Sequence, residues 1–112
     1  IYSPDGSPYA AIGAAGGTTI PLQTARGISG LIDFNMPVED ALGLPLLMAF
    51  GDRVLVEEGT WFEEKMGVFK AFGHTQIIAR KPPLKAGAVH WNGQEWVAAR
   101  DPRLNGLLET TP

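Results

Sequence analysis

The sequence contains no cysteine, which excludes disulfide bonds, thiolate metal sites and cysteine nucleophiles. It also lacks a long apolar run. The longest such stretch, residues 41–50, is interrupted by Gly43 and Pro45, so we expect no membrane-spanning helix. Basic residues are few and scattered, with 9 Lys and Arg against 12 Asp and Glu and a net charge of −3. This pattern indicates no nucleic-acid partner and no attraction to an acidic membrane surface.

The remaining composition is that of an ordinary globular chain. Its 112 residues, 45% of them hydrophobic and 19% charged, suffice for one domain or part of one with a real core. The first residues show no signal-peptide pattern, and the compartment is left open. Residues 1–6 already have turn chemistry, which is typical of the middle of a protein rather than its start.

Hydrophobic periodicity and turn residues predict an α+β fold with the element order β–α–α–β–α–β–β–β. The closing pair of strands is joined at Asn92-Gly93, a strong hairpin signal. Residues 46–50 are expected to be irregular. The predicted strands cover residues 8–14, 53–57, 76–79, 86–91 and 95–100; the predicted helices cover 19–34, a short segment from Pro37, and 60–72.

Two of these helices carry further expectations. The first has a helical stripe formed by Ile20, Ala25, Ile28, Leu31 and Ile32. Its Gly27 and Gly30 weaken the helix, so we expect them to mark close packing on a sheet. The third begins with a capping box at Thr60 and Glu63 and ends at Gly73. We expect its aromatic residues to form a helix core: Trp61, Phe62, Phe69 and Phe72.

The glycine pair Gly16-Gly17 is the most informative local feature. A strand stops there and a helix starts, with Thr18 or Thr19 able to cap it and Pro21 suited to its first turn. Glycines expose bare backbone N–H groups, and the helix N-terminus adds partial positive charge. Such a place suits a phosphate, a carboxylate or the oxyanion of acyl transfer. The alternative is a tight turn that needs positive φ and has no ligand.

Residue types that usually perform chemistry are sparse. His74 follows a helix and His90 alternates with apolar positions in a strand, so we interpret His90 as a strand-surface residue. The two histidines have no carboxylate at ligand spacing and make no metal motif. No cofactor is indicated. The four glutamates near the third helix fit a solvated acidic face better than an acid/base pair: Glu57, Glu58, Glu63 and Glu64.

Asp101 and Arg103, on either side of Pro102, form the last pattern of note. A buried or half-buried Asp beside an Arg after a final strand can form an ion pair or hold a loop. A plain structural turn is the alternative.

An ordered set of motifs over nearly the whole chain resembles the γ-glutamyltranspeptidase family. Each motif is moderately specific by itself, and their common order is the stronger signal. The matching segments are Asp5-Gly6-Ser7-Pro8, Gly13-Ala14-Ala15-Gly16-Gly17-Thr18, Met36-Pro37-Val38-Glu39-Asp40-Ala41, Val54-Leu55-Val56-Glu57-Glu58-Gly59, Phe72-Gly73-His74, Asn92-Gly93-Gln94-Glu95 and Ala98-Ala99-Arg100-Asp101-Pro102-Arg103.

The resemblance implies an N-terminal-nucleophile hydrolase, an αββα sandwich made by self-cleavage of a precursor. Residues 1–112 then correspond to the C-terminal part of the small subunit, with the rest of that subunit and the large subunit as partners. The family's nucleophile is an N-terminal Thr. Since Ile1 has neither hydroxyl nor thiol, the resemblance places the nucleophile upstream. It also implies a γ-glutamyl or other small amide substrate and a periplasmic or extracellular location, with a cytoplasmic one still open.

What the resemblance assigns to residues of this chain is the oxyanion hole, formed by the backbone N–H groups of Gly16 and Gly17. Asp101 and Arg103 match a structural motif and receive no catalytic role. The family's Ser-Pro before the glycines is Ala14-Ala15 here, and other segments differ too, so amide acyl transfer or hydrolysis is a firmer expectation than γ-glutamyl specificity. A cephalosporin-acylase-like amidase, an inactive binding or assembly module, and an independent small-anion-binding domain stay open.

Overall fold

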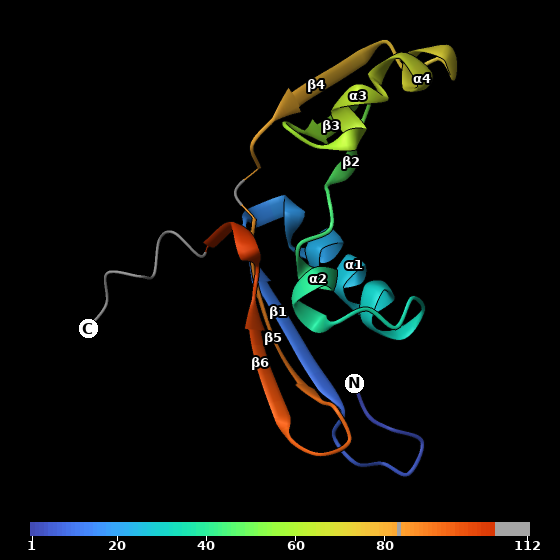
Figure 1. Ribbon diagram of the computed structural model, residues 1–112. Helices are drawn as coiled ribbons and strands as arrows, with labels where there is room; N and C mark the ends of the chain where they lie inside the picture. The colour runs from blue at the N-terminus through green and yellow to red at the C-terminus, as the bar shows by residue number, and fades with distance from the viewer. Residues whose placement is uncertain (83, 105–112) are drawn as a thin grey trace, which may run out of the picture. The chain divides into compact units, whose positions relative to one another are not determined.

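The computed structural model describes residues 1–82 and 84–104. The chain divides into two compact units (Figure 1). The first unit joins Ile1–Leu44 to Leu84–Pro112, and the second unit is the segment between them, Pro45–Pro83. The mixture of helices and strands confirms the α+β class.

The first unit is built on an antiparallel sheet with the strand order β1-β5-β6. The register pairs Ala10 with His90 and Ala15 with Lys85, and the hairpin strands meet at Trp91 and Trp96. The sheet and its hairpin confirm the strands predicted at both ends of the chain. The elements of this unit are β1 (Ala10–Ala15), η1 (Gly17–Thr19), α1 (Ile20–Ile32), α2 (Val38–Leu42), β5 (Lys85–Trp91), β6 (Trp96–Arg100) and η2 (Pro102–Leu104).

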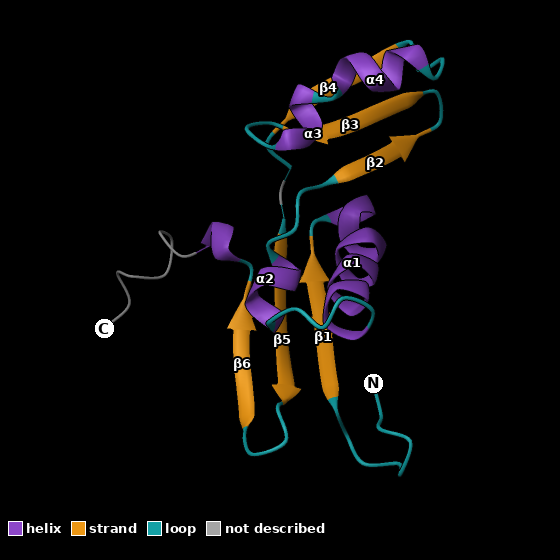
Figure 2. Cartoon of the chain, turned by 45° about the vertical axis from the view of Figure 1, so that its right-hand side comes forward, coloured by secondary structure: helices purple, strands orange, loops and turns teal. Residues whose placement is uncertain are grey.

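Helices α1 and α2 cover one face of this sheet (Figure 2). The buried core between the helices and the sheet consists of Ala10, Leu31, Val38, Leu42, Ala86 and Ala88. Small strand residues let the helices approach closely, and burial of this apolar surface stabilises the unit by about 25 cal/mol per Å². The core therefore lies on the helix side of the sheet.

The predicted stripe of α1 is largely wrong. Ile20, Ile28 and Ile32 are exposed, whereas the buried residues of the helix are Gln23, Gly27, Gly30 and Leu31. The two glycines are buried because they are contact points. A Cβ on Gly27 would lie 3.3 Å from Leu42 and 3.5 Å from Ile12, and one on Gly30 would lie 2.7 Å from the Ala41 Cβ. The sheet contact expected of both glycines is therefore made at Gly27, while Gly30 packs on α2.

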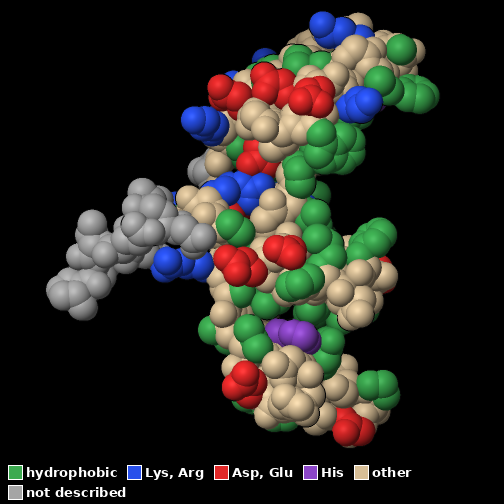
Figure 3. All heavy atoms as spheres, in the orientation of Figure 1, with side chains coloured by type: hydrophobic (Ala, Val, Ile, Leu, Met, Phe, Trp, Pro, Cys, Tyr) green, Lys and Arg blue, Asp and Glu red, His purple; other side chains and the backbone are tan. Residues whose placement is uncertain are grey.

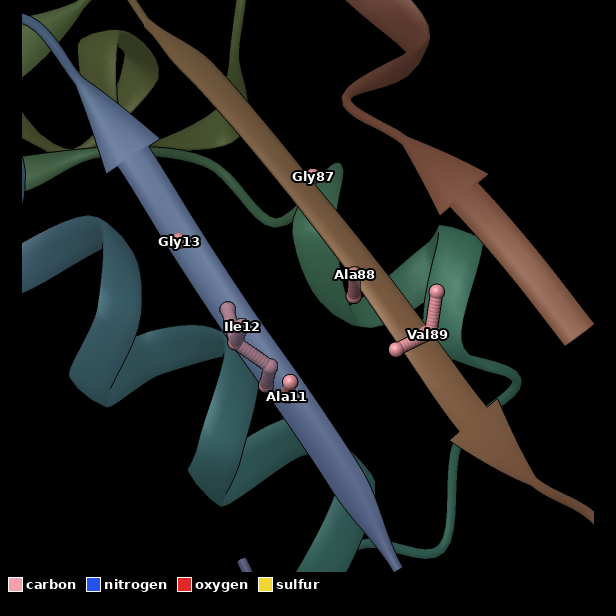
Figure 4. Close-up of a pocket in the computed structure, with 6 residues that line it drawn as sticks. All are labelled: Ala11, Ile12, Gly13, Gly87, Ala88 and Val89. Carbon is pink, nitrogen blue, oxygen red and sulfur yellow. The ribbon is translucent and has the colours of Figure 1, made fainter. Parts of the chain in front are cut away.

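On the other face of the sheet, the middle of β1 and β5 carries little side-chain bulk. Paired residues such as Ala11 and Val89, or Gly13 and Gly87, line a shallow hollow on it (Figure 4). Ala11 and Gly13 are exposed, and Val89 is 41% exposed. We call this side of the sheet the open face.

The second unit holds another three-stranded sheet, of order β2-β3-β4. Strands β2 and β3 pair antiparallel, and β3 and β4 pair parallel across two short helices. Its elements are β2 (Leu47–Phe50), β3 (Arg53–Glu57), α3 (Trp61–Glu64), α4 (Met66–Ala71) and β4 (Gln76–Arg80).

Strand β2 corrects the expectation that residues 46–50 are irregular. It pairs Leu47 with Val56 and Phe50 with Arg53, through a two-residue turn at Gly51-Asp52. Gly51 has φ +55°, the left-handed conformation that such a hairpin turn requires. The pairing with β3 makes this apolar segment a strand.

The expected third helix is two helices, separated at Lys65, whose ψ of 9° interrupts the helical path. The expected capping box does not form. Glu63 Oε2 accepts from Gly59 N rather than from Thr60 N, and the Thr60 hydroxyl donates to the Glu57 carbonyl at 2.7 Å and does not cap the helix. The helices therefore start without the reciprocal hydrogen bonds that the sequence pattern suggested.

The aromatic residues of α3 and α4 do not form a buried core, because neither helix contains a buried residue. Trp61 is 54% exposed and Phe72 80% exposed, and Figure 3 shows hydrophobic side chains at the surface of this unit, in the upper part of the view. The expectation of a solvated acidic face is wrong for Glu57. This residue is buried, and its Oε2 accepts from Leu46 N at 2.9 Å.

Candidate functional site

The Gly16-Gly17 turn connects the end of β1 to the start of α1 through η1. Gly16 has φ +134° and Gly17 has φ +63°, so both positions use backbone conformations that favour glycine. A Cβ on Gly17 would meet nothing within 4 Å. The positive φ predicted for a tight turn is therefore present, and the space above Gly17 is open.

The peptide N–H groups of the two glycines distinguish this turn. Thr19 N donates to the Gly16 carbonyl, and Ile20 N donates to the Gly17 carbonyl. Among the described residues, the N–H groups of Gly16 and Gly17 donate no hydrogen bond in this turn. Gly17 is exposed and Gly16 is half-buried, so the turn is open to solvent at Gly17.

Thr19 and Gln23 have roles here that the sequence did not indicate. Thr19 occupies the N-cap position of α1 but makes no capping bond; its hydroxyl donates to the Gly16 carbonyl at 2.8 Å. Gln23, one turn further, is fully buried, and its Nε2 donates to the Ala15 carbonyl and to Thr19 Oγ1. The sequence pattern that could have indicated this contact is the spacing of Thr19 and Gln23, four positions apart and therefore on the same face of a helix.

The histidines do not take part in this turn. His74 is exposed. His90 is half-buried, and its ring lies edge-on to the Tyr9 ring with the centroids 4.9 Å apart. Its Nε2 has no hydrogen-bond partner among the described residues. Since His90 pairs with Ala10, it lies at the opposite end of β1 from the glycines.

A groove of about 510 Å³ lies at the same distant end. It is lined by the N-terminal loop, including Ile1 and Tyr2, and by Ile28 and Ile32 of α1. The six residues of β1 span roughly 20 Å. The groove is therefore not part of the glycine turn.

Asp101 and Arg103 form the ion pair that the sequence pattern suggested. Arg103 Nη1 lies 2.9 Å and 3.0 Å from the two carboxylate oxygens of fully buried Asp101. The same guanidinium donates to the carbonyls of Leu42, the last residue of α2, and of the next two residues, Gly43 and Leu44. These contacts hold the backbone after β6 against the end of α2.

Two other properties concern the whole described chain. No group of three or more His, Asp or Glu residues within residues 1–82 and 84–104 is placed to hold a metal ion. Over the same residues, no helix has the length and hydropathy needed to cross a bilayer.

Comparison with known proteins identifies the family. The fold is shared with N-terminal-nucleophile hydrolases of the transpeptidase group. The chain belongs to the gamma-glutamyltranspeptidase family, because the family model "Gamma-glutamyltranspeptidase" matches residues 1–110. The resemblance carried by the ordered motifs is thereby confirmed. A comparison with curated protein sequences gave no match.

Solved structures support the fold. A mutant gamma-glutamyltranspeptidase from Helicobacter pylori has a TM-score of 0.75 at 24% identity, over 92% of this chain and 58% of that chain. An acivicin-inhibited gamma-glutamyltranspeptidase has 0.75 at 23%, over 92% and 57%. A cephalosporin acylase from Bacillus halodurans has 0.72 at 19%, over 88% and 19%. The chain thus spans a little over half the length of the two transpeptidase chains.

Proposed function

We propose that residues 1–112 are the C-terminal segment of the small subunit of a self-processed amide acyl hydrolase or transferase. Its acyl donor is a γ-glutamyl or related small amide, and its nucleophile is an N-terminal Thr outside these residues. Its partners are the remaining part of the small subunit and the large subunit. The family match supports the enzyme class. The uncovered open face of the first unit fits a layer of the αββα sandwich that packs on another sheet.

In this proposal Gly16 and Gly17 form the oxyanion hole. The observation that carries it is the pair of N–H groups left without a backbone acceptor among the described residues, in the turn that leads through η1 into α1. Attack of a hydroxyl on an amide carbonyl places negative charge on the carbonyl oxygen. Two fixed N–H donors and the positive end of a helix stabilise that charge more than they stabilise the neutral substrate.

The test is Gly17→Val in the complete processed enzyme, with kcat and KM measured on a γ-glutamyl anilide. Valine is strained at φ +63° and turns the N–H away from its present direction. Losing one oxyanion donor typically lowers kcat by roughly 10²–10³-fold, and KM changes less because the substrate carbonyl carries little charge.

Gly51→Val is the matched control. Gly51 has φ +55°, and a Cβ added there would meet nothing within 4 Å. A valine at this position therefore suffers the same backbone strain as one at Gly17, but in a turn of the second unit. We expect the control to keep the wild-type kcat. A Gly17→Val enzyme that folds, self-processes and also keeps the wild-type kcat would leave only a tight turn at this position.

A cephalosporin-acylase-like amidase is the second candidate, favoured by the structural match to such an enzyme. The glycine turn serves both reactions equally, because the donors are backbone groups. Comparing kcat/KM on a γ-glutamyl anilide and on the side-chain amide of a cephalosporin separates the two. Absence of turnover on both substrates by the processed protein would instead favour a binding or assembly module.

A further inference from the structure

The carboxamide of Gln23 is the most fully bonded buried polar group of the first unit outside the ion pair. Its Nε2 donates to the Ala15 carbonyl and to Thr19 Oγ1, each at 2.9 Å. Its Oε1 accepts from Lys85 N at 3.0 Å. The side chain has no exposed surface. One amide thus joins the end of β1, the start of α1 and the start of β5.

One of these contacts, together with a hydrogen bond from Thr19, determines where the glycine N–H groups point. In a planar trans peptide the C=O and the following N–H point in opposite directions. Gln23 fixes the Ala15 carbonyl, and the same peptide unit carries the N–H of Gly16. The Thr19 hydroxyl fixes the Gly16 carbonyl at 2.8 Å, and that peptide unit carries the N–H of Gly17.

The two tethers form one chain of hydrogen bonds. Because the Thr19 hydroxyl proton is used on the Gly16 carbonyl, its oxygen is left to accept from Gln23 Nε2. Gln23 therefore sets the hydroxyl in the orientation that holds the second peptide. Without these bonds, the two adjacent glycines are restrained only by the backbone bonds from Thr19 N and Ile20 N, and an oxyanion hole depends on donors that are fixed before the reaction.

We propose that Gln23 and Thr19 are the positioning residues of the oxyanion hole, acting through the carbonyls of Ala15 and Gly16. This inference rests on the proposed function of Gly16 and Gly17. Neither side chain touches the substrate. Together they fix the peptide units that carry both N–H donors and hold them during acyl transfer.

The experiment compares Thr19→Val with Thr19→Ser in the complete processed enzyme. Valine keeps the shape of threonine and removes the hydroxyl, whereas serine keeps the hydroxyl. Gln23→Met is the second variant, since it fills a similar volume without hydrogen bonds. Thr24→Val is the control, because the Thr24 hydroxyl donates to the Ile20 carbonyl within the same helix and does not contact the turn.

We expect Thr19→Val and Gln23→Met to lower kcat by about 10- to 100-fold on a γ-glutamyl anilide, with KM changing less than about threefold. Thr19→Ser and Thr24→Val should stay close to wild type. The variants that lose kcat should bind a boronic acid analogue of the substrate more weakly by a similar factor, because its tetrahedral adduct places an anion where the donors point. A purely structural role would lower the melting temperature and leave these ratios unchanged.

The outcomes separate the two proposals. If Gly17→Val loses kcat while folded Thr19→Val and Gln23→Met keep it, the oxyanion hole stands and the positioning role is wrong. If Thr19→Ser loses as much kcat as Thr19→Val, the hydroxyl is not the tether and the positioning role is wrong as well. If Gly17→Val keeps the wild-type kcat, the proposed function fails, and this inference fails with it.

Discussion

Arg103 binds both carboxylate oxygens of Asp101, and the same guanidinium donates hydrogen bonds to the carbonyl groups of residues 42–44. Asp101 also accepts from Arg103 N at 2.9 Å, and its own N–H donates to the Ala86 carbonyl. The pair therefore ties η2 to the C-terminal end of α2 and to β5. Each of these partners is a backbone group or the other member of the pair. The ion pair therefore has a structural role, which is to hold these backbone segments together.

We predict that Asp101→Asn lowers stability by about 1–3 kcal/mol, because it removes the charge that faces a partly buried guanidinium. Thermal unfolding of the complete enzyme and the fraction of processed precursor are the measurements. The exposed Asp33→Asn is the control. Loss of kcat in a processed enzyme with unchanged melting would contradict a structural role.

A second prediction concerns two helical glycines with different surroundings. Gly30→Ala places a Cβ 2.7 Å from the Ala41 Cβ and 3.1 Å from its Cα, so α1 and α2 must separate. The overpacking outweighs the gain in helix propensity, and we expect a net loss of about 1–2 kcal/mol. Gly67→Ala in α4 meets nothing within 4 Å and should gain up to about 1 kcal/mol. Denaturant unfolding of both variants tests the opposite signs, and equal effects would refute the close contact.

Glu57 provides a third prediction. Glu57→Leu leaves the Leu46 N–H without its carboxylate acceptor in a buried place, which should cost about 1–3 kcal/mol. Glu58→Leu alters the exposed neighbour and should change stability by less than about 0.5 kcal/mol. Thermal melting of the two variants should therefore differ clearly. If both melt like the wild type, the contact between Glu57 and Leu46 does not hold β2 in place.

The fourth prediction concerns residues 1–112 produced by themselves. The open face and the exposed Trp61, Phe72 and Trp96 present apolar surface to water. We expect this polypeptide to bind a hydrophobic dye and to associate, because strand edges and apolar faces favour contacts between copies. Size-exclusion chromatography and dye fluorescence are the measurements. A soluble monomer with a cooperative melt would refute the proposal that these residues are a segment of a larger enzyme.

Local chemistry made several features of the fold predictable. Gly16-Gly17 and Asn92-Gly93 require positive φ at a glycine, and the structure has it at Gly16, Gly17 and Gly93. The Asn92 side chain also accepts from the N–H groups of Gln94 and Glu95, which closes the hairpin turn. These turns are set by neighbouring residues, so the sequence alone is sufficient to locate them.

Features that depend on distant partners were not predictable in the same way. Strand β2 forms because it pairs with β3, and the buried side of α1 is decided by the contacts of Gly27 and Gly30. Periodicity favours isoleucine over glycine for a buried face, so it selected the wrong residues. Gln23 was missed for the same reason, since its partner Lys85 lies 62 residues away. For the glycine pair, local chemistry predicted an anion site or a plain turn, and the family resemblance selected an oxyanion among the possible anions; that role stays a prediction.

The division of the first unit has a consequence for the order of synthesis. Within the described residues, β1 finds its strand partner only in β5, and α2 receives Arg103 from η2. The second unit is one continuous segment of the sequence, residues 45–83, and it separates the two segments of the first unit along the chain. Pairing across such separations is slow, because the intervening chain must first be made and closed. On the ribosome the second unit can therefore fold first, while the turn at Gly16-Gly17 acquires its contact with Lys85 only after that residue has emerged.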